Sequence, residues 1–131
     1  VIRGKELFDQ AKCSSCHVSN FRTNVNVAFP AMSNQLIHPY TDLLVHDMGE
    51  GLADHRPDFR ADGYEWRTAP LWGVGLLETV NYPAYYLHDG RARTLVEAVM
   101  WHGGEAEFSV DFVKQLSTVD RKALFAFLKS L

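Results

Sequence analysis

The sequence has few cysteines, no excess of basic residues and no long apolar run. Its only cysteines are Cys13 and Cys16, too few for a disulfide framework. The formal charge of −3 offers no basic field for nucleic acid, and no apolar stretch is long enough to cross a membrane. Internal repeats and low-complexity tracts are also absent. With 131 residues, 47% of them hydrophobic, the chain is expected to form one domain over residues 1–131.

The two cysteines share one motif, Cys13-Ser14-Ser15-Cys16-His17, which is typical of covalent haem attachment. On a tight turn, each thiol can add to one of two neighbouring vinyl groups on a haem edge. His17 then lies under the ring, where an imidazole nitrogen can bind the iron. We therefore predict one haem c, attached through Cys13 and Cys16, with His17 as an axial ligand.

Three other interpretations of the motif are weaker. A zinc site needs further ligands, but there is no third cysteine, and His38 and His46 are eight residues apart (46 − 38), unlike a finger-type pair. A thioredoxin-like dithiol needs a preceding strand, whereas an amphipathic helix is expected here. A disulfide between Cys13 and Cys16 would close a loop too short to stabilise much.

Haem c attachment also predicts where the protein matures. Such attachment takes place outside the bacterial cytoplasm, so we expect a periplasmic protein. The chain begins at Val1 and shows no signal peptide, so we expect a mature, processed or excised piece. Both cysteines are used by the haem, which leaves no free thiol for chemistry.

The two ends of the chain carry helical patterns. Residues 3–12 have apolar residues at helical spacing and lead into the haem motif. Residues 117–131 begin at a cap formed by Ser117 and Asp120 and present a broad apolar face. We expect the two helices to pack together, with Gly4 allowing a close crossing.

A third helix is expected over residues 94–102. Thr94 and Glu97 have the spacing of a capping box, and Gly103-Gly104 follows as a stop signal. The fold class predicted from these elements is all-α, with a long irregular insertion between the haem motif and the last two helices.

The region between the haem motif and residue 93 shows no sustained period. Residues 18–40 are expected to be a long loop with one helical turn near 31–37, in which Met32 and His38 pack or face solvent. The residues that punctuate this loop are Asn20, Asn24, Asn26, Pro30, Ser33, Asn34 and Pro39. Residues 41–65 are expected to be a solvated acidic loop, a docking face for a basic redox partner; their spacing does not match a calcium loop.

Residues 66–93 are rich in aromatics, glycine and proline, which suits irregular backbone packed on a flat apolar ligand. Arg67, and less so Arg91 and Arg93, are candidates to bind haem propionates, because a guanidinium fork matches a carboxylate. The alternative is that they are surface arginines. We take His46, His55 and His88 as structural or exposed, with His88 a candidate hydrogen-bonding group near the haem edge.

The helix–motif–helix order resembles the class I cytochrome c fold. More specific segments resemble the C-terminal haem domain of di-haem cytochrome c peroxidases and MauG-like proteins, and most closely the di-haem oxidoreductases. The segments that carry this resemblance are Arg67-Thr68-Ala69-Pro70-Leu71, Tyr86-Leu87-His88-Asp89-Gly90-Arg91, Thr94-Leu95-Val96-Glu97-Ala98-Val99, Leu44-Val45-His46-Asp47-Met48-Gly49 and Trp101-His102-Gly103-Gly104-Glu105-Ala106.

The resemblance implies a function and its limits. Those relatives carry two haem domains, whereas this chain has one haem motif, and it is similar to their electron-entry domain. We therefore expect electron transfer through one haem, with a redox protein or a second haem domain as partner. The alternatives are a peroxidase-like oxidoreductase with a labile distal ligand and, less strongly, a haem-based ligand sensor.

The resemblance also bears on the sixth iron ligand and the haem contacts. The family helix that begins at Thr94 ends in the distal ligand, and His102 occupies that place here, on the helix face expected to meet the core. Met48, in a glycine-bounded loop, is the alternative ligand. Arg67, Pro70 and Trp101 complete the expected haem contacts. A pair of histidines would give a low-spin iron of low potential, and methionine would raise the potential.

Overall fold

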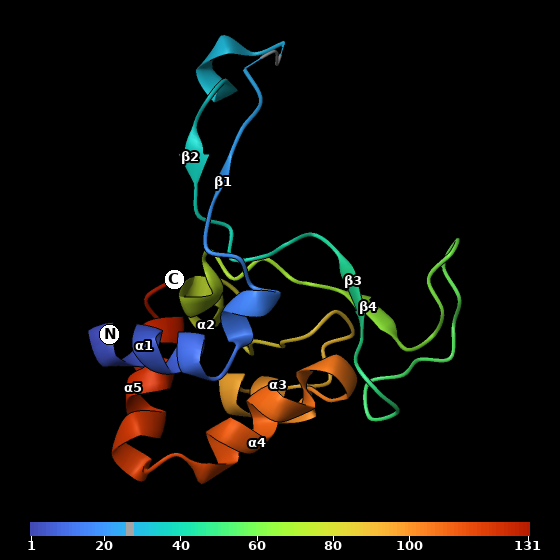
Figure 1. The fold of residues 1–131 in the computed structure, drawn as a ribbon, viewed down its shortest axis with the longest axis vertical. Helices are drawn as coiled ribbons and strands as arrows, with labels where there is room; N and C mark the ends of the chain where they lie inside the picture. Colours follow the sequence, from blue (N-terminus) through green and yellow to red (C-terminus); the bar gives the residue numbers. More distant parts are fainter. Residues whose placement is uncertain (26–27) are drawn as a thin grey trace.

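Helices form the body of the molecule (Figure 1) in the computed structural model, which describes residues 1–25 and 28–131. The α-helices are α1 (Ile2–Gln10), α2 (Leu77–Val80), α3 (Leu95–Trp101), α4 (Glu107–Gln115) and α5 (Thr118–Leu128). Short 3₁₀ turns are η1 (Cys13–Ser15), η2 (Pro30–Met32), η3 (Val74–Leu76) and η4 (Gly104–Ala106). Within the described ranges, every helix is too short or too polar to cross a membrane.

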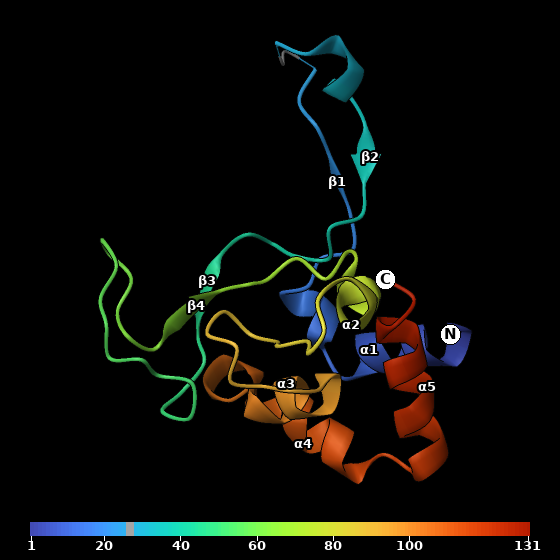
Figure 2. The same cartoon turned by 180° about the vertical axis from the view of Figure 1, so that it is seen from behind.

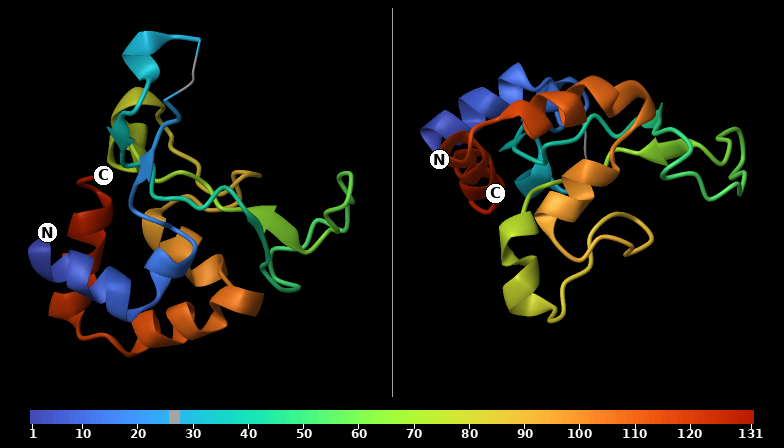
Figure 3. Two further views of the ribbon diagram at one scale, coloured as in Figure 1. Left: turned by 45° about the horizontal axis from the view of Figure 1, so that its top comes forward. Right: turned by 90° about the horizontal axis from the view of Figure 1, so that it is seen from below.

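Two antiparallel hairpins leave the helical body in different directions (Figures 1 and 3). The strands β1 (Phe21–Arg22) and β2 (Leu36–Ile37) form the first hairpin, and β3 (Val45–Asp47) and β4 (Glu65–Arg67) form the second. The all-α prediction is therefore corrected to a mostly helical fold. Strands of two or three residues are too short to show the alternation by which a sequence reveals a strand.

The packing of α1 against α5 is the centre of the core (Figure 2). Phe8 of α1 meets Phe127 of α5 with ring centroids 5.4 Å apart. The helices approach closely because Gly4 has no side chain: a Cβ there would lie 2.0 Å from the carbonyl oxygen of Ala123. The prediction that Gly4 permits this crossing is confirmed.

The predicted caps are largely confirmed. The hydroxyl of Thr94 accepts from the backbone N–H of Glu97 (3.0 Å), and Ser117 accepts likewise from Asp120 (3.1 Å). In a capping box, the carboxylate of Glu97 would accept from the backbone N–H of Thr94. Here it accepts instead from the N–H of Arg93, one residue earlier (2.7 Å).

The helix α4 was not predicted. It lies between the two helices expected to be last, so the predicted element order is wrong at this point. Its buried Val110 and Val113 are spaced as on a helix face, a signal that could have revealed it. In the predicted loop 18–40, the helical turn is a 3₁₀ turn at Pro30–Met32 and is flanked by strands; Asn26 lies outside the described residues.

Candidate haem-binding site

The two cysteines lie on the turn that follows α1. Cys13 begins η1, Cys16 follows it, and the N–H of His17 bonds back to the carbonyl of Cys13 (2.9 Å). The thiols are not joined to each other. Burial raises the pKa of Cys13 to about 11 and, to a lesser extent, raises that of Cys16. At neutral pH both thiols are protonated, which disfavours dithiol exchange.

The imidazole of His17 is held in one tautomer by the backbone. Its Nδ1 lies 2.9 Å from the carbonyl oxygen of Tyr40, so Nδ1 carries the proton and Nε2 keeps its lone pair. The ring of Tyr40 packs edge-on against Phe8 and Phe127 at 6.2 and 6.0 Å, which fixes this carbonyl to the α1–α5 core. Burial lowers the pKa of His17 to about 4, so the ring is neutral, as a metal ligand must be.

His102 has a similar environment. It ends α3, and its Nδ1 lies 2.7 Å from the carbonyl oxygen of Ala98, so its Nε2 also keeps the lone pair. Burial lowers the pKa of His102. His102 itself contributes to the lowered pKa of His17, so the two imidazoles lie within electrostatic reach of each other. The fold thus brings together the two histidines that the sequence singled out.

Met48, the alternative ligand, belongs to a loop packed against the turn after His102. A Cβ on Gly103 would lie 3.0 Å from the carbonyl oxygen of Met48, and one on Gly104 would lie 2.7 Å from the N–H nitrogen of Gly49. The two glycines therefore let this loop approach the end of α3. Met48 is half-buried. Met100, in contrast, lines a groove of about 250 Å³ with residues of α4 and α5.

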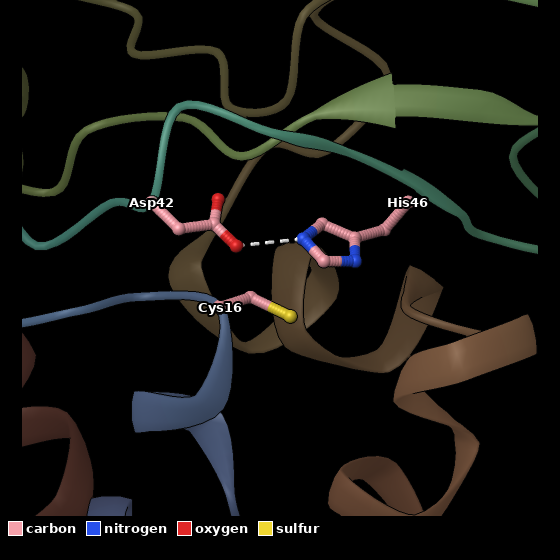
Figure 4. Close-up of side chains that lie close together, drawn as sticks. All are labelled: Cys16, Asp42 and His46. Atoms are coloured by element: carbon pink, nitrogen blue, oxygen red, sulfur yellow. Dashed lines mark hydrogen bonds and ion pairs between the residues drawn. The ribbon is translucent and has the colours of Figure 1, made fainter.

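Cys16, Asp42 and His46 lie side by side (Figure 4), with one potential ligand atom from each within 4.8 Å of the others. This proximity was not predicted. His46 already binds carboxylates through both ring nitrogens: Nε2 lies 2.8 Å from Asp42, and Nδ1 lies 2.9 Å from Glu105. The group is therefore better described as a hydrogen-bonded cluster beside Cys16 than as a zinc site.

The arginines proposed for the propionates have different environments. Arg91 pairs with Asp89, donates to the carbonyl of Gly51 (2.6 Å), and lies over the rings of Trp66 and Trp101 at 5.9 and 5.3 Å. Arg93 pairs with Glu97 (3.2 Å). Arg67 is exposed and, across residues 1–25 and 28–131, has no ion pair. Of the three arginines, it is therefore the one best placed to donate hydrogen bonds to a carboxylate.

The other residues that the sequence singled out differ in their exposure and in their contacts within the protein. Trp101 is 41% exposed and shares a face with Arg91, and Pro70 is half-buried. His88 stacks on Trp66 at 5.5 Å and donates to the carbonyl of Arg67, so its Nε2 is engaged by the protein. The other residues singled out, Met32, His38 and His55, are exposed.

These features fit an iron porphyrin. Two neutral imidazoles keep their Nε2 lone pairs, and two protonated thiols share a turn next to one of them. A dithiol enzyme would need a depressed thiol pKa, whereas burial raises the pKa of both thiols here. The protein is mostly helical, and its candidate site has the residue types that a haem-binding protein of the redox class would need.

The comparison with protein-family models also indicates a haem-binding redox protein. The chain belongs to the family described as "Di-haem oxidoreductase, putative peroxidase", whose model matches residues 1–131. The resemblance noted from the sequence motifs is confirmed, and membership implies a haem cofactor and haem-based redox chemistry. A search of curated proteins and a search of solved structures each found no match.

Proposed function

We propose that this domain transfers single electrons through one c-type haem, bound by thioether bonds to Cys13 and Cys16 in a class I cytochrome c-like arrangement. His17 and His102 would hold the iron. The observation that carries the proposal is the matched state of the two imidazoles, each with Nδ1–H bonded to a backbone carbonyl and Nε2 unprotonated.

The protein's own groups suit this role. The haem supplies one-electron exchange when bound. The carbonyls of Tyr40 and Ala98 orient both rings, so neither ligand has to turn when the charge changes. Burial keeps both imidazoles neutral, so each can present an unprotonated Nε2 to the iron.

The location of the protein and the kind of partner it has are inferred from the same haem chemistry. Covalent haem attachment supports a periplasmic location. The partner is a redox protein or a second haem domain, and the acidic residues 41–65 favour a basic docking surface on it.

A peroxidase-like activity is the second candidate. It is supported by the family description and by the place of His102, which ends a helix and is followed by two glycines. The bond from Nδ1 to the carbonyl of Ala98 would also hold the ring if Nε2 left the iron. Such a release would open a coordination position for peroxide.

The test is the ferric absorption spectrum of the haem-loaded protein, extended into the near infrared, for the natural chain and for His102→Ala and Met48→Leu. We expect a low-spin spectrum without a methionine-to-iron band, unchanged in Met48→Leu and high-spin in His102→Ala. A methionine band that Met48→Leu abolishes would assign Met48 instead. A high-spin natural protein would favour the peroxidase-like function, and haem extracted by acidified organic solvent would exclude thioether attachment.

A further inference from the structure

Three hydrogen-bonded side chains extend from beside Cys16 to the segment that carries His102. Asp42 and Glu105 bind opposite nitrogens of His46, at 2.8 and 2.9 Å. Carboxylates accept hydrogen bonds, so both nitrogens donate and His46 is an imidazolium. We name Asp42, His46 and Glu105 the carboxylate clasp.

Glu105 binds the segment that carries His102 to β3 through both of its carboxylate oxygens. Oε2 binds the ring of His46, and Oε1 accepts from the backbone N–H of Asp47 (3.1 Å). Only Gly103 and Gly104 separate Glu105 from His102, and glycines supply no side chain to anchor the backbone. Glu105 is therefore the first side chain after His102 that can hold this turn against its neighbour.

The other end of the clasp is anchored in the interior. Asp42 accepts through its second oxygen from the N–H of Leu44 (2.9 Å). The preceding Thr41 is fully buried, and its hydroxyl donates to the carbonyl of Thr68 (2.7 Å). Asp42 and His46 also face the sulfur of Cys16 (Figure 4), so this end of the clasp is fixed beside the haem-attachment turn.

We propose that the carboxylate clasp is a positioning device that holds His102 in place and thereby limits how readily an external ligand reaches the distal side of the iron. This inference rests on the proposed axial pair of His17 and His102. With the clasp intact, the segment after α3 keeps its contact with β3, and His102 returns to its place after any transient release. With the clasp broken, the two glycines leave that segment free to move away, and the distal position opens.

The experiment measures cyanide binding to the haem-loaded ferric protein by stopped-flow absorbance. Glu105→Gln removes the charge that binds His46. The matched control is Glu97→Gln, which removes the ion pair to Arg93 at the opposite end of α3. We expect Glu105→Gln to bind cyanide several-fold faster, because a neutral amide oxygen is a weaker acceptor than a carboxylate, with Glu97→Gln close to the natural protein.

The reference variant His102→Ala separates this inference from the proposed function. Rapid cyanide binding by His102→Ala with an unchanged rate in Glu105→Gln would overturn the clasp and leave the axial pair standing. Equal rates in His102→Ala and the natural protein would overturn the axial pair itself.

A measurement on the natural protein applies even if Glu105→Gln does not fold. The clasp requires the backbone N–H of the exposed Asp47 to be bonded to Glu105, so hydrogen exchange at this amide should be slowed about tenfold or more relative to an unbonded exposed amide. Exchange at the unprotected rate would overturn the clasp.

Discussion

At the scale of single residues, Arg91 was a candidate to bind a haem propionate, and its side chain contacts several other groups of the protein. Its guanidinium lies between the rings of Trp66 and Trp101 and binds both Asp89 and the carbonyl of Gly51. A planar cation can satisfy all of these partners at once. Arg91 therefore joins the segment after β3, strand β4 and the end of α3, next to the proposed distal ligand.

We expect Arg91→Met to lower the free energy of unfolding by about 1–2 kcal/mol, because two cation–π contacts and the hydrogen bonds to Asp89 and Gly51 are lost. Urea denaturation followed by circular dichroism measures the change. Arg93→Met removes an arginine whose pair with Glu97 is solvent-exposed, and should cost about 0.5 kcal/mol or less. Equal losses in the two variants would show that the Arg91 contacts add nothing specific.

At the scale of elements, the crossing of α1 and α5 determines where the haem motif begins. Leu7, Phe8 and Ala11 of the first helical segment are buried in this crossing, and η1 follows directly. The carbonyl of Tyr40 that orients His17 is fixed by aromatic contacts to the same helices. The geometry of the proximal side therefore depends on how closely the two helices approach.

Replacing Gly4 with alanine should force the crossing apart, because the added Cβ would lie 2.0 Å from the carbonyl oxygen of Ala123. We expect a loss of about 1–3 kcal/mol in unfolding free energy, measured by thermal and urea denaturation. Gly51→Ala is the matched control, since the nearest atom would be 3.9 Å away, and its effect should stay within about 0.5 kcal/mol. A neutral Gly4→Ala would contradict the close crossing.

The contact between β3 and η4 should depend on pH. Hydrogen bonding to Glu105, followed by that to Asp42, raises the pKa of His46 above its usual 6.5, although burial opposes the rise. A raised pKa in the folded state means that the stabilisation is fully present below pH 6.5 and is lost as the pH rises through the folded value. Besides these two carboxylates, the Cys16 thiol faces this ring.

The stability difference between the natural protein and His46→Gln should accordingly be larger at pH 6 than at pH 9, because the stabilisation declines as the pH rises through the raised pKa of His46. Urea unfolding at the two pH values gives this difference directly. A difference that stayed constant, or that grew with pH, would show that His46 is not charged in the folded protein.

At the scale of the whole molecule, charge is unevenly distributed. Residues 41–65 contain seven acidic residues and two arginines, within a chain of formal charge −3. Most of these side chains are exposed on the hairpin that carries β3 and β4, which extends from the helical body (Figure 1). Such a distribution attracts cations and repels anions during diffusional encounter.

The haem-loaded protein should therefore exchange electrons faster with a cationic metal complex than with an anionic one of similar potential, by about tenfold at low ionic strength. Added salt should reduce the difference. Reversing two exposed charges, with Glu50→Lys and Asp54→Lys, should weaken the preference, as stopped-flow reduction would show. Identical rates for both reagents at low salt would exclude this hairpin as a steering surface.

The sequence alone was sufficient where the signal is local. Helix spacing, the caps at Thr94 and Ser117, and the close approach at Gly4 depend on neighbouring residues or on one missing side chain, so they could be predicted and are observed. The strands were missed because strands of two or three residues carry almost no periodicity, and no element was assigned to the residues of α4, between the stop signal at Gly103-Gly104 and the cap at Ser117.

The candidate groups, two thiols for haem attachment and His17 with His102 or Met48 for the iron, could be proposed from the sequence, because thioether formation and iron binding require particular atoms at a particular spacing. The tertiary structure decided their states. Backbone carbonyls of Tyr40 and Ala98 select the tautomers of His17 and His102, and burial sets their pKa. The clasp likewise joins residues 59 positions apart (46 to 105). Such contacts arise only when the chain folds, because tautomer, desolvation and long-range hydrogen bonds depend on what is near in space rather than in sequence.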